Sequence, residues 1–234
     1  MFAPSLQTNP NPPSDAMTLL NIDIVSDVVC PWCFVGTRRM ARALDLLRAE
    51  GRELAVTMRW LPFFLNPDTP PVGEPYRPFL EKKFGGAAAV EALWERVRSA
   101  GRSVGLELAF EKITVRANTL QAHRLLHWAQ QRGDVDALVE RLFAANFHNG
   151  EHVGDPAVLQ RIAVECGYPA AEVAAYLASD IDTELVRAEE RRVRELGVRS
   201  VPTYIFDGRS TISGAETPEI LADAIRRHLA DAAA

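Results

Sequence analysis

Two cysteines three positions apart, Cys30 and Cys33, are the residues of this 234-residue chain best suited to chemistry. A pair with this spacing can alternate between dithiol and disulfide, because the second sulfur lies about one helical turn from the first and can resolve a mixed disulfide. Cys30 is then the attacking thiol and Cys33 the resolving thiol, and no metal or organic cofactor is needed. Pro31 suits an early helical position, where its missing N–H would be unpaired. Trp32 could offer an apolar surface to a substrate, and simple packing explains it equally well.

The main alternative for such a pair is half of a zinc site. That site needs two further ligands, and the candidates are Cys166, His123, His127, His148, His152 and His228. The histidine spacings do not form the helical motif of a zinc protease. We therefore expect no metal at the cysteine pair. Cys166 follows an apolar helical pattern, which is typical of a buried and unreactive cysteine.

Composition limits the partners and the compartment. The chain has 26 Lys and Arg against 31 Asp and Glu, so no general positive field would hold nucleic acid. It contains no run of about 20 apolar residues, so we expect no membrane association. The first sixteen residues lack the basic and apolar regions of a secretory signal. We interpret residues 1–17 as a disordered tail, with Met17 as an alternative start, and expect a cytoplasmic protein.

Apolar periodicity places the cysteine pair at a strand-to-helix turn. Leu20, Ile22 and Ile24 alternate with polar residues, which predicts a strand; helical spacing follows over 37–50, and strand alternation returns over 54–60. This β-α-β order implies parallel strands. Cys30 would lie at the positive end of the helix dipole, which favours a thiolate by up to about 2 kcal/mol. Asp27 would oppose ionisation, so we predict a moderately activated nucleophile.

Along the rest of the chain, the pattern of apolar residues changes twice. A proline-rich connection over 66–78 is followed by helical spacing from about 87 to 196, which predicts an inserted all-helical subdomain. Within it, Asp155 as an N-cap and Pro156 at the first helical position predict the start of one helix. Asp207-Gly208 then separates two short strand-like runs, as expected for a tight hairpin. A helix over 217–229 closes the chain. The predicted order is β-α-β, a long helical insertion, and β-β-α.

Five stretches of the sequence resemble one protein superfamily. SDVVCPWC and GVRSVPTYIF resemble the DsbA-like thioredoxin superfamily, and WLPFFLNP, ANTLQAHRL and LFAANFHNG extend the match. More narrowly, the chain is similar to FrnE-type proteins, which are related to 2-hydroxychromene-2-carboxylate isomerases and kappa-class glutathione transferases. The resemblance implies an α/β, thioredoxin-like fold. We assign its two parts to residues 18–66 and 197–234, on either side of the helical insertion at 67–196.

The resemblance also implies a substrate-binding edge opposite the cysteines. The resemblance implies that Pro202 is a cis-proline, which leaves the Val201 backbone free to bind an extended substrate or glutathione. Without the resemblance a trans bond would be favoured, because only about 5% of X-Pro bonds are cis. Asn118 is a further candidate for substrate binding, and a helix cap is the equally favoured alternative. His123 belongs to the same motif and could border the cleft.

Both cysteines together favour disulfide chemistry, since the isomerase and transferase relatives typically carry a serine in place of Cys30. The expected function is a thiol-disulfide oxidoreductase that acts on protein or small-molecule thiols and disulfides, with glutathione as a candidate co-substrate. Ser200 stands where many relatives carry glycine, which bears on substrate preference. Two alternatives stay open: a glutathione-dependent isomerase or transferase, and a chaperone-like binding module that uses the helical region.

Overall fold

The computed structural model describes residues 18–232, so the predicted tail over 1–17 lies outside the described residues. Its main sheet has the strand order β2-β1-β5-β6. The strands are β1 (Thr18–Ser26), β2 (Leu54–Pro62), β5 (Thr203–Phe206) and β6 (Ser210–Ser213). β1 pairs in parallel with β2 and antiparallel with β5, and β6 is antiparallel to β5. With α1 (Pro31–Ala49) joining the two parallel strands, the predicted β-α-β and β-β-α parts are confirmed.

β1 lies inside the sheet and sends its side chains to two different cores. Leu20, Ile22 and Ile24 belong to the main core with α1, whereas Val25 packs with Ile205 in a smaller core on the opposite face. Successive strand side chains point to opposite faces. The last residue of β1 therefore projects to the α1 face, towards the start of that helix.

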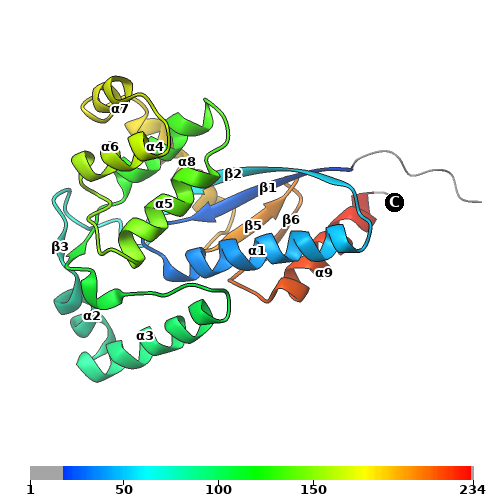
Figure 1. Ribbon diagram of the computed structural model, residues 1–234, viewed down its shortest axis with the longest axis horizontal. Coiled ribbons are helices and arrows are strands. Elements are labelled where there is room, and N and C mark those ends of the chain that lie inside the picture. Colours follow the sequence, from blue (N-terminus) through cyan, green and yellow to red (C-terminus); the bar gives the residue numbers. More distant parts are fainter. Residues whose placement is uncertain (1–17, 233–234) are drawn as a thin grey trace, which may run out of the picture.

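Helices cover both faces of the sheet. α9 (Pro218–Ala232) packs beside α1, and α8 (Thr183–Glu195) packs on β2 (Figure 1). α1 ends at Ala49, and Gly51 follows with φ at 78°, a left-handed conformation that glycine adopts without a side-chain clash. This turn lets the chain enter β2 directly after α1, so the helix connects two strands that are paired side by side in the sheet.

The insertion between β2 and β5 is helical, as predicted. Its helices are α2 (Tyr76–Phe84), α3 (Ala87–Arg102), the 3-10 helix η1 (Phe110–Lys112), α4 (Leu120–Gln130), α5 (Asp136–Phe147), α6 (Pro156–Glu165), α7 (Ala170–Leu177) and α8. The insertion also contains a two-residue strand pair, β3 (Glu74–Pro75) with β4 (Val115–Arg116), which is too short to leave a periodic pattern. Figure 1 shows the inserted helices gathered around the end of the sheet at which α1 begins.

Two of the predicted local signals are confirmed. Asp155 caps α6, because its carboxylate accepts a hydrogen bond from the Ala157 N–H at 2.8 Å, and Pro156 occupies the first helical position. Asp207 and Gly208 have φ angles of 48° and 68° in the turn between β5 and β6. Within residues 18–232, no helix is both long enough and apolar enough to cross a membrane.

Candidate active site

The turn after β1 places Cys30 at the N-cap of α1. Its backbone is extended, with φ −92° and ψ 110°, and Pro31 begins the helix. The Cys30 N–H donates to the Asp27 carbonyl at 2.9 Å, and the Cys30 carbonyl accepts from the Cys33 N–H at 3.0 Å. The predicted placement at the positive end of the helix is thus confirmed. The Cys30 side chain is largely covered, and both cysteines of the pair are free thiols.

Cys33 lies one turn inside the helix and is almost fully buried, with 1% of its surface exposed. Burial raises the pKa of the Cys33 thiol well above its ordinary value, and the neighbouring Cys30 raises it further. The Ser26 hydroxyl and the Asp27 backbone partly offset this rise in pKa. The resting form of Cys33 is therefore the protonated thiol, which must lose its proton before it can attack a disulfide.

The chain from Val201 to Tyr204 faces the cysteine pair from the other side. The Val201-Pro202 peptide bond is cis, as the resemblance implied, and the Val201 carbonyl lies 3.7 Å from Cys30 Sγ. The approach to α1 is close, because a Cβ added at Gly36 would come within 2.9 Å of Pro202 Cγ. The fold thus brings together residues that lie 171 positions apart in the sequence.

The sequence and the fold of this chain are both similar to those of known proteins. The family model named DSBA-like thioredoxin domain matches residues 21–226 of the sequence. The chain belongs to this DsbA-like family. A solved structure, the probable DsbA oxidoreductase SCO1869 from Streptomyces coelicolor, is 30% identical, with 89% of each chain covered and a TM-score of 0.78.

Two more distant structures share the fold of this DsbA-like chain. A 2-hydroxychromene-2-carboxylate isomerase is 17% identical with a TM-score of 0.58, and 91% of this chain and 98% of that one are covered. The cytosolic disulfide reductase DsbM from Pseudomonas aeruginosa, solved with GSH, is 15% identical with a TM-score of 0.61, and 89% and 98% of the two chains are covered. At these identities the likeness shows the fold alone.

Three other predicted site residues, Pro31, Trp32 and Asn118, differ in their exposure and contacts. Pro31 and Trp32 are partly exposed, and Trp32 also packs against the main core. Asn118 lies before α4, where its amide donates to the Thr69 carbonyl at 2.7 Å and its side-chain oxygen accepts from the Leu120 N–H at 3.1 Å. The N-cap of α4 is Thr119, so Asn118, the predicted cap, lies one position before it, although it does accept from an N–H of the first turn. Substrate binding by Asn118 stays a prediction.

Asp27, three residues before Cys30, contacts His123 of α4. Both side chains are buried, and His123 Nε2 lies 3.4 Å from Asp27 Oδ1. The Asp27 carboxylate accepts hydrogen bonds from the backbone N–H of Leu65 at 2.9 Å and of Val29 at 3.5 Å. The sequence marked both residues as candidates near the site, but α4 and β1 are far apart in the chain, so their contact could not be predicted.

Sequence reasoning missed two residues beside the pair, Ser26 and Tyr204. Tyr204 of β5 is fully buried, with its hydroxyl close to Gly36 of α1. Burial raises the pKa of this hydroxyl, and the nearby Cys33 and Cys30 thiols raise it further. Neither the Ser26 nor the Tyr204 hydroxyl has a hydrogen-bond partner among the described residues. Strand alternation was the available signal, because it places Tyr204 on the same face as Pro202.

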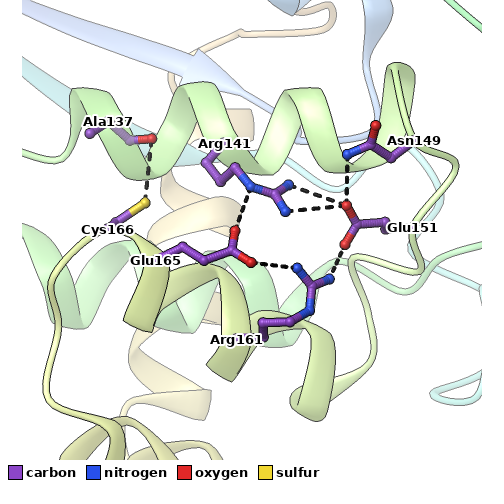
Figure 2. A network of polar contacts seen from close by, with 7 residues as sticks. All are labelled: Ala137, Arg141, Asn149, Glu151, Arg161, Glu165 and Cys166. Atoms are coloured by element: carbon purple, nitrogen blue, oxygen red, sulfur yellow. Dashed lines mark hydrogen bonds and ion pairs between the residues drawn. The ribbon is translucent and has the colours of Figure 1, made fainter.

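Cys166 stands apart from this site, at the end of α6. Its thiol is 3.7 Å from the Ala137 carbonyl of α5 (Figure 2), and partial burial raises its pKa. The side chain is only partly buried, which corrects the predicted buried setting, because α6 ends at the surface here. Within residues 18–232, no group of three or more His, Cys, Asp or Glu side chains is arranged to hold a metal ion.

Proposed function

We propose that this DsbA-like protein is a thiol-disulfide oxidoreductase that works through Cys30 and Cys33. The observation that carries the proposal is the position of Cys30, at the N-terminus of α1 and 3.7 Å from the Val201 carbonyl. From this helix end Cys30 attacks a substrate disulfide as a thiolate and releases one substrate sulfur as a thiolate. Cys33 then attacks Cys30 Sγ, so the substrate gains two electrons and the cysteine pair becomes a disulfide.

The Val201 backbone is the proposed substrate dock. Val201 is partly exposed, and an extended peptide or glutathione could add its backbone to this edge as a further strand would. That alignment would hold a substrate sulfur beside Cys30. Pro202 and Trp32 would flank the bound segment.

We propose thiols and disulfides of proteins or small molecules as substrates, with glutathione among them. Family membership supports this class, and the DsbM structure with GSH makes glutathione a reasonable first ligand to test. The exchange of electrons uses cysteine sulfurs alone and requires no metal or organic cofactor. We further propose a FrnE-type protein of the cytoplasm, without nucleic-acid or membrane partners.

A glutathione redox titration tests this function. The wild type should titrate as a two-electron dithiol-disulfide couple and should reduce insulin or refold RNase. Cys30→Ser and Cys33→Ser should each lose the two-electron transition. A Cys30→Ser variant with full dithiol activity would show the assignment to be wrong.

The second candidate is a glutathione-dependent isomerase or transferase, which the shared fold of the 2-hydroxychromene-2-carboxylate isomerase favours. A measured glutathione affinity without any dithiol activity would support it. A chaperone-like module is the non-enzymatic alternative, and its activity would survive replacement of both cysteines by serine.

A further inference from the structure

A small cavity lies where the ends of β1 and β2 meet α4 and α5. It has about 10 Å³ of space for the centre of a water molecule, which is room for about one water. Ser26 and His123 both line it, and we call it the Ser26–His123 cavity. Ser26 Oγ and His123 Nε2 have no hydrogen-bond partner within residues 18–232. Buried polar atoms are nearly always paired with protein or with ordered water, so the site is suited to a bridging water.

The surroundings of His123 make Nε2 a good place to hold a proton. The side chain is 5% exposed, and Nε2 lies 3.4 Å from the buried Asp27 carboxylate without forming a hydrogen bond. With no proton on Nε2 the imidazole gains nothing from this contact, whereas a proton taken up at Nε2 would face the negative carboxylate. Phe64 packs edge-on against the ring, with centroids 5.4 Å apart, and limits its movement.

Cys33 is the group that needs a proton acceptor. It is buried, its pKa is raised by that burial, and the Ser26 hydroxyl lies beside it without reaching ideal hydrogen-bond geometry. A serine hydroxyl can accept one proton and donate another. Ser26 therefore stands between the thiol that must be deprotonated and the cavity that leads to His123.

We propose that the proton of Cys33 leaves through Ser26 and one cavity water to His123 Nε2, and that Asp27 stabilises the imidazolium that forms. This inference rests on the proposed function, because it concerns the resolving step of disulfide exchange. His123 receives the proton through Ser26 and the water and does not touch the reacting sulfurs, so it is a positioning residue.

The bonds of the resolving step balance as follows. The S–H bond of Cys33 breaks, a bond forms between the sulfurs of Cys33 and Cys30, and the bond from Cys30 to the substrate sulfur breaks. The substrate leaves as a thiolate with that electron pair. Ser26 takes the Cys33 proton and passes its own proton to the water, which protonates His123. The dithiol is oxidised by two electrons and the substrate disulfide is reduced by two.

Other charged groups also face His123. His127 of α4 and Glu189 of α8 line the same cavity, with His127 Nδ1 3.9 Å from the Glu189 carboxylate. Glu190 and Arg194 of α8 hold the backbone of Phe64 at 3.3 and 2.8 Å. Because these charged groups lie around His123, the test compares variants over a pH range.

The test uses the full chain with Cys166→Ser as background and the chromogenic disulfide 5,5′-dithiobis(2-nitrobenzoate). Stopped-flow absorbance follows two releases of the coloured thiolate, first by Cys30 and then by Cys33. Ser26→Ala and His123→Gln should slow the second release by on the order of tenfold or more near pH 6–7, a modest loss for a proton acceptor. The first release should keep its rate, and the deficit should shrink at high pH, where hydroxide deprotonates Cys33.

His152→Gln is the matched control, because its Nε2 is also buried and unpaired among the described residues but does not line this cavity. It should leave both releases unchanged. A second release at the wild-type rate in both Ser26→Ala and His123→Gln overturns the proposal, as does an equal slowing at every pH. A background protein that shows no second release would instead contradict the proposed function itself.

Discussion

An ion-pair network in the helical insertion and the redox site differ in how their polar side chains are paired. Between α5 and α6, Arg141 and Arg161 each bind both Glu151 and Glu165 (Figure 2). The Arg141 Nε and Arg161 Nη1 contacts to Glu165 are both 2.7 Å, and Asn149 donates to Glu151 at 2.8 Å. Each of these five side chains has a partner in the network, so the network ties α5 to α6.

Around the cysteine pair, several buried polar atoms lack such partners. Ser26, His123 and Tyr204 each carry one with no hydrogen bond among the described residues. An unpaired buried polar group costs about 1–3 kcal/mol. The contrast suggests that the paired region holds the architecture, whereas the unpaired region keeps groups free to exchange protons with the thiols.

The largest effect is expected where the two sides of the redox site touch. Gly36→Ala places a Cβ against Pro202 and Tyr204 and should push that segment away from Cys30. Alanine in place of a helical glycine normally adds about 0.5–1 kcal/mol of stability, so a loss is diagnostic of the clash. We expect dithiol turnover to fall by on the order of tenfold or more and unfolding free energy by about 1–3 kcal/mol. Unchanged insulin reduction would contradict this.

A matched pair of tyrosines tests paired against unpaired hydroxyls. Tyr176 donates from its hydroxyl, which lies 3.0 Å from both the Arg124 carbonyl and an Asp182 carboxylate oxygen, whereas the Tyr204 hydroxyl has no partner among the described residues. Tyr176→Phe should lower the free energy of unfolding by about 1 kcal/mol, and Tyr204→Phe should leave it unchanged or raise it by up to about 1 kcal/mol. Urea denaturation measures both, and equal losses would remove the contrast.

The ion-pair network should matter for stability alone. Glu151→Gln weakens contacts to Arg141 and Arg161 and should lower the free energy of unfolding by about 1 kcal/mol, with dithiol activity unchanged. Glu184 is the control, because it is largely exposed and 3.8 Å from Arg187. Glu184→Gln should have no measurable effect. A loss of activity in Glu151→Gln would mean that the two regions are coupled.

The smallest effect is a pH dependence of the same network. Hydrogen bonds from Arg161 and Arg141 lower the pKa of Glu165. Burial raises the pKa of Glu151, but hydrogen bonds from Asn149 and Arg161 outweigh this rise, so the pKa of Glu151 is also lowered. Each carboxylate thus stabilises the fold above its unfolded pKa, near 4.3, and loses this contribution as pH falls through the lower folded pKa. Glu151→Gln should flatten the loss of stability below about pH 4.3. An unchanged acid slope would contradict this.

The sequence predicted the features that depend on neighbouring residues. The CPWC pair at a strand-to-helix turn, the Asp155 cap and the Asp207-Gly208 turn are all local patterns. The cis Val201-Pro202 bond opposite Cys30 followed only from the family resemblance.

Contacts between distant segments could not be predicted. The approach of His123 to Asp27 depends on how α4 packs at the end of β1, and nothing local in ANTLQAHRL specifies it. The β3-β4 pair is formed by only two residues on each side, so no period marks it. Cys166 was expected to be buried because its neighbours are apolar, but the end of α6 leaves it partly exposed.

The most direct test of the central claim is to trap the mixed disulfide. Cys30→Ser and Cys33→Ser, both with Cys166→Ser, are incubated with glutathione disulfide and mapped by peptide mass spectrometry. We predict one glutathione on Cys30 in the Cys33→Ser protein, and none on the buried Cys33 in the Cys30→Ser protein. Glutathione on Cys33 with Cys30 left unmodified, or full dithiol exchange by Cys30→Ser, would contradict the account.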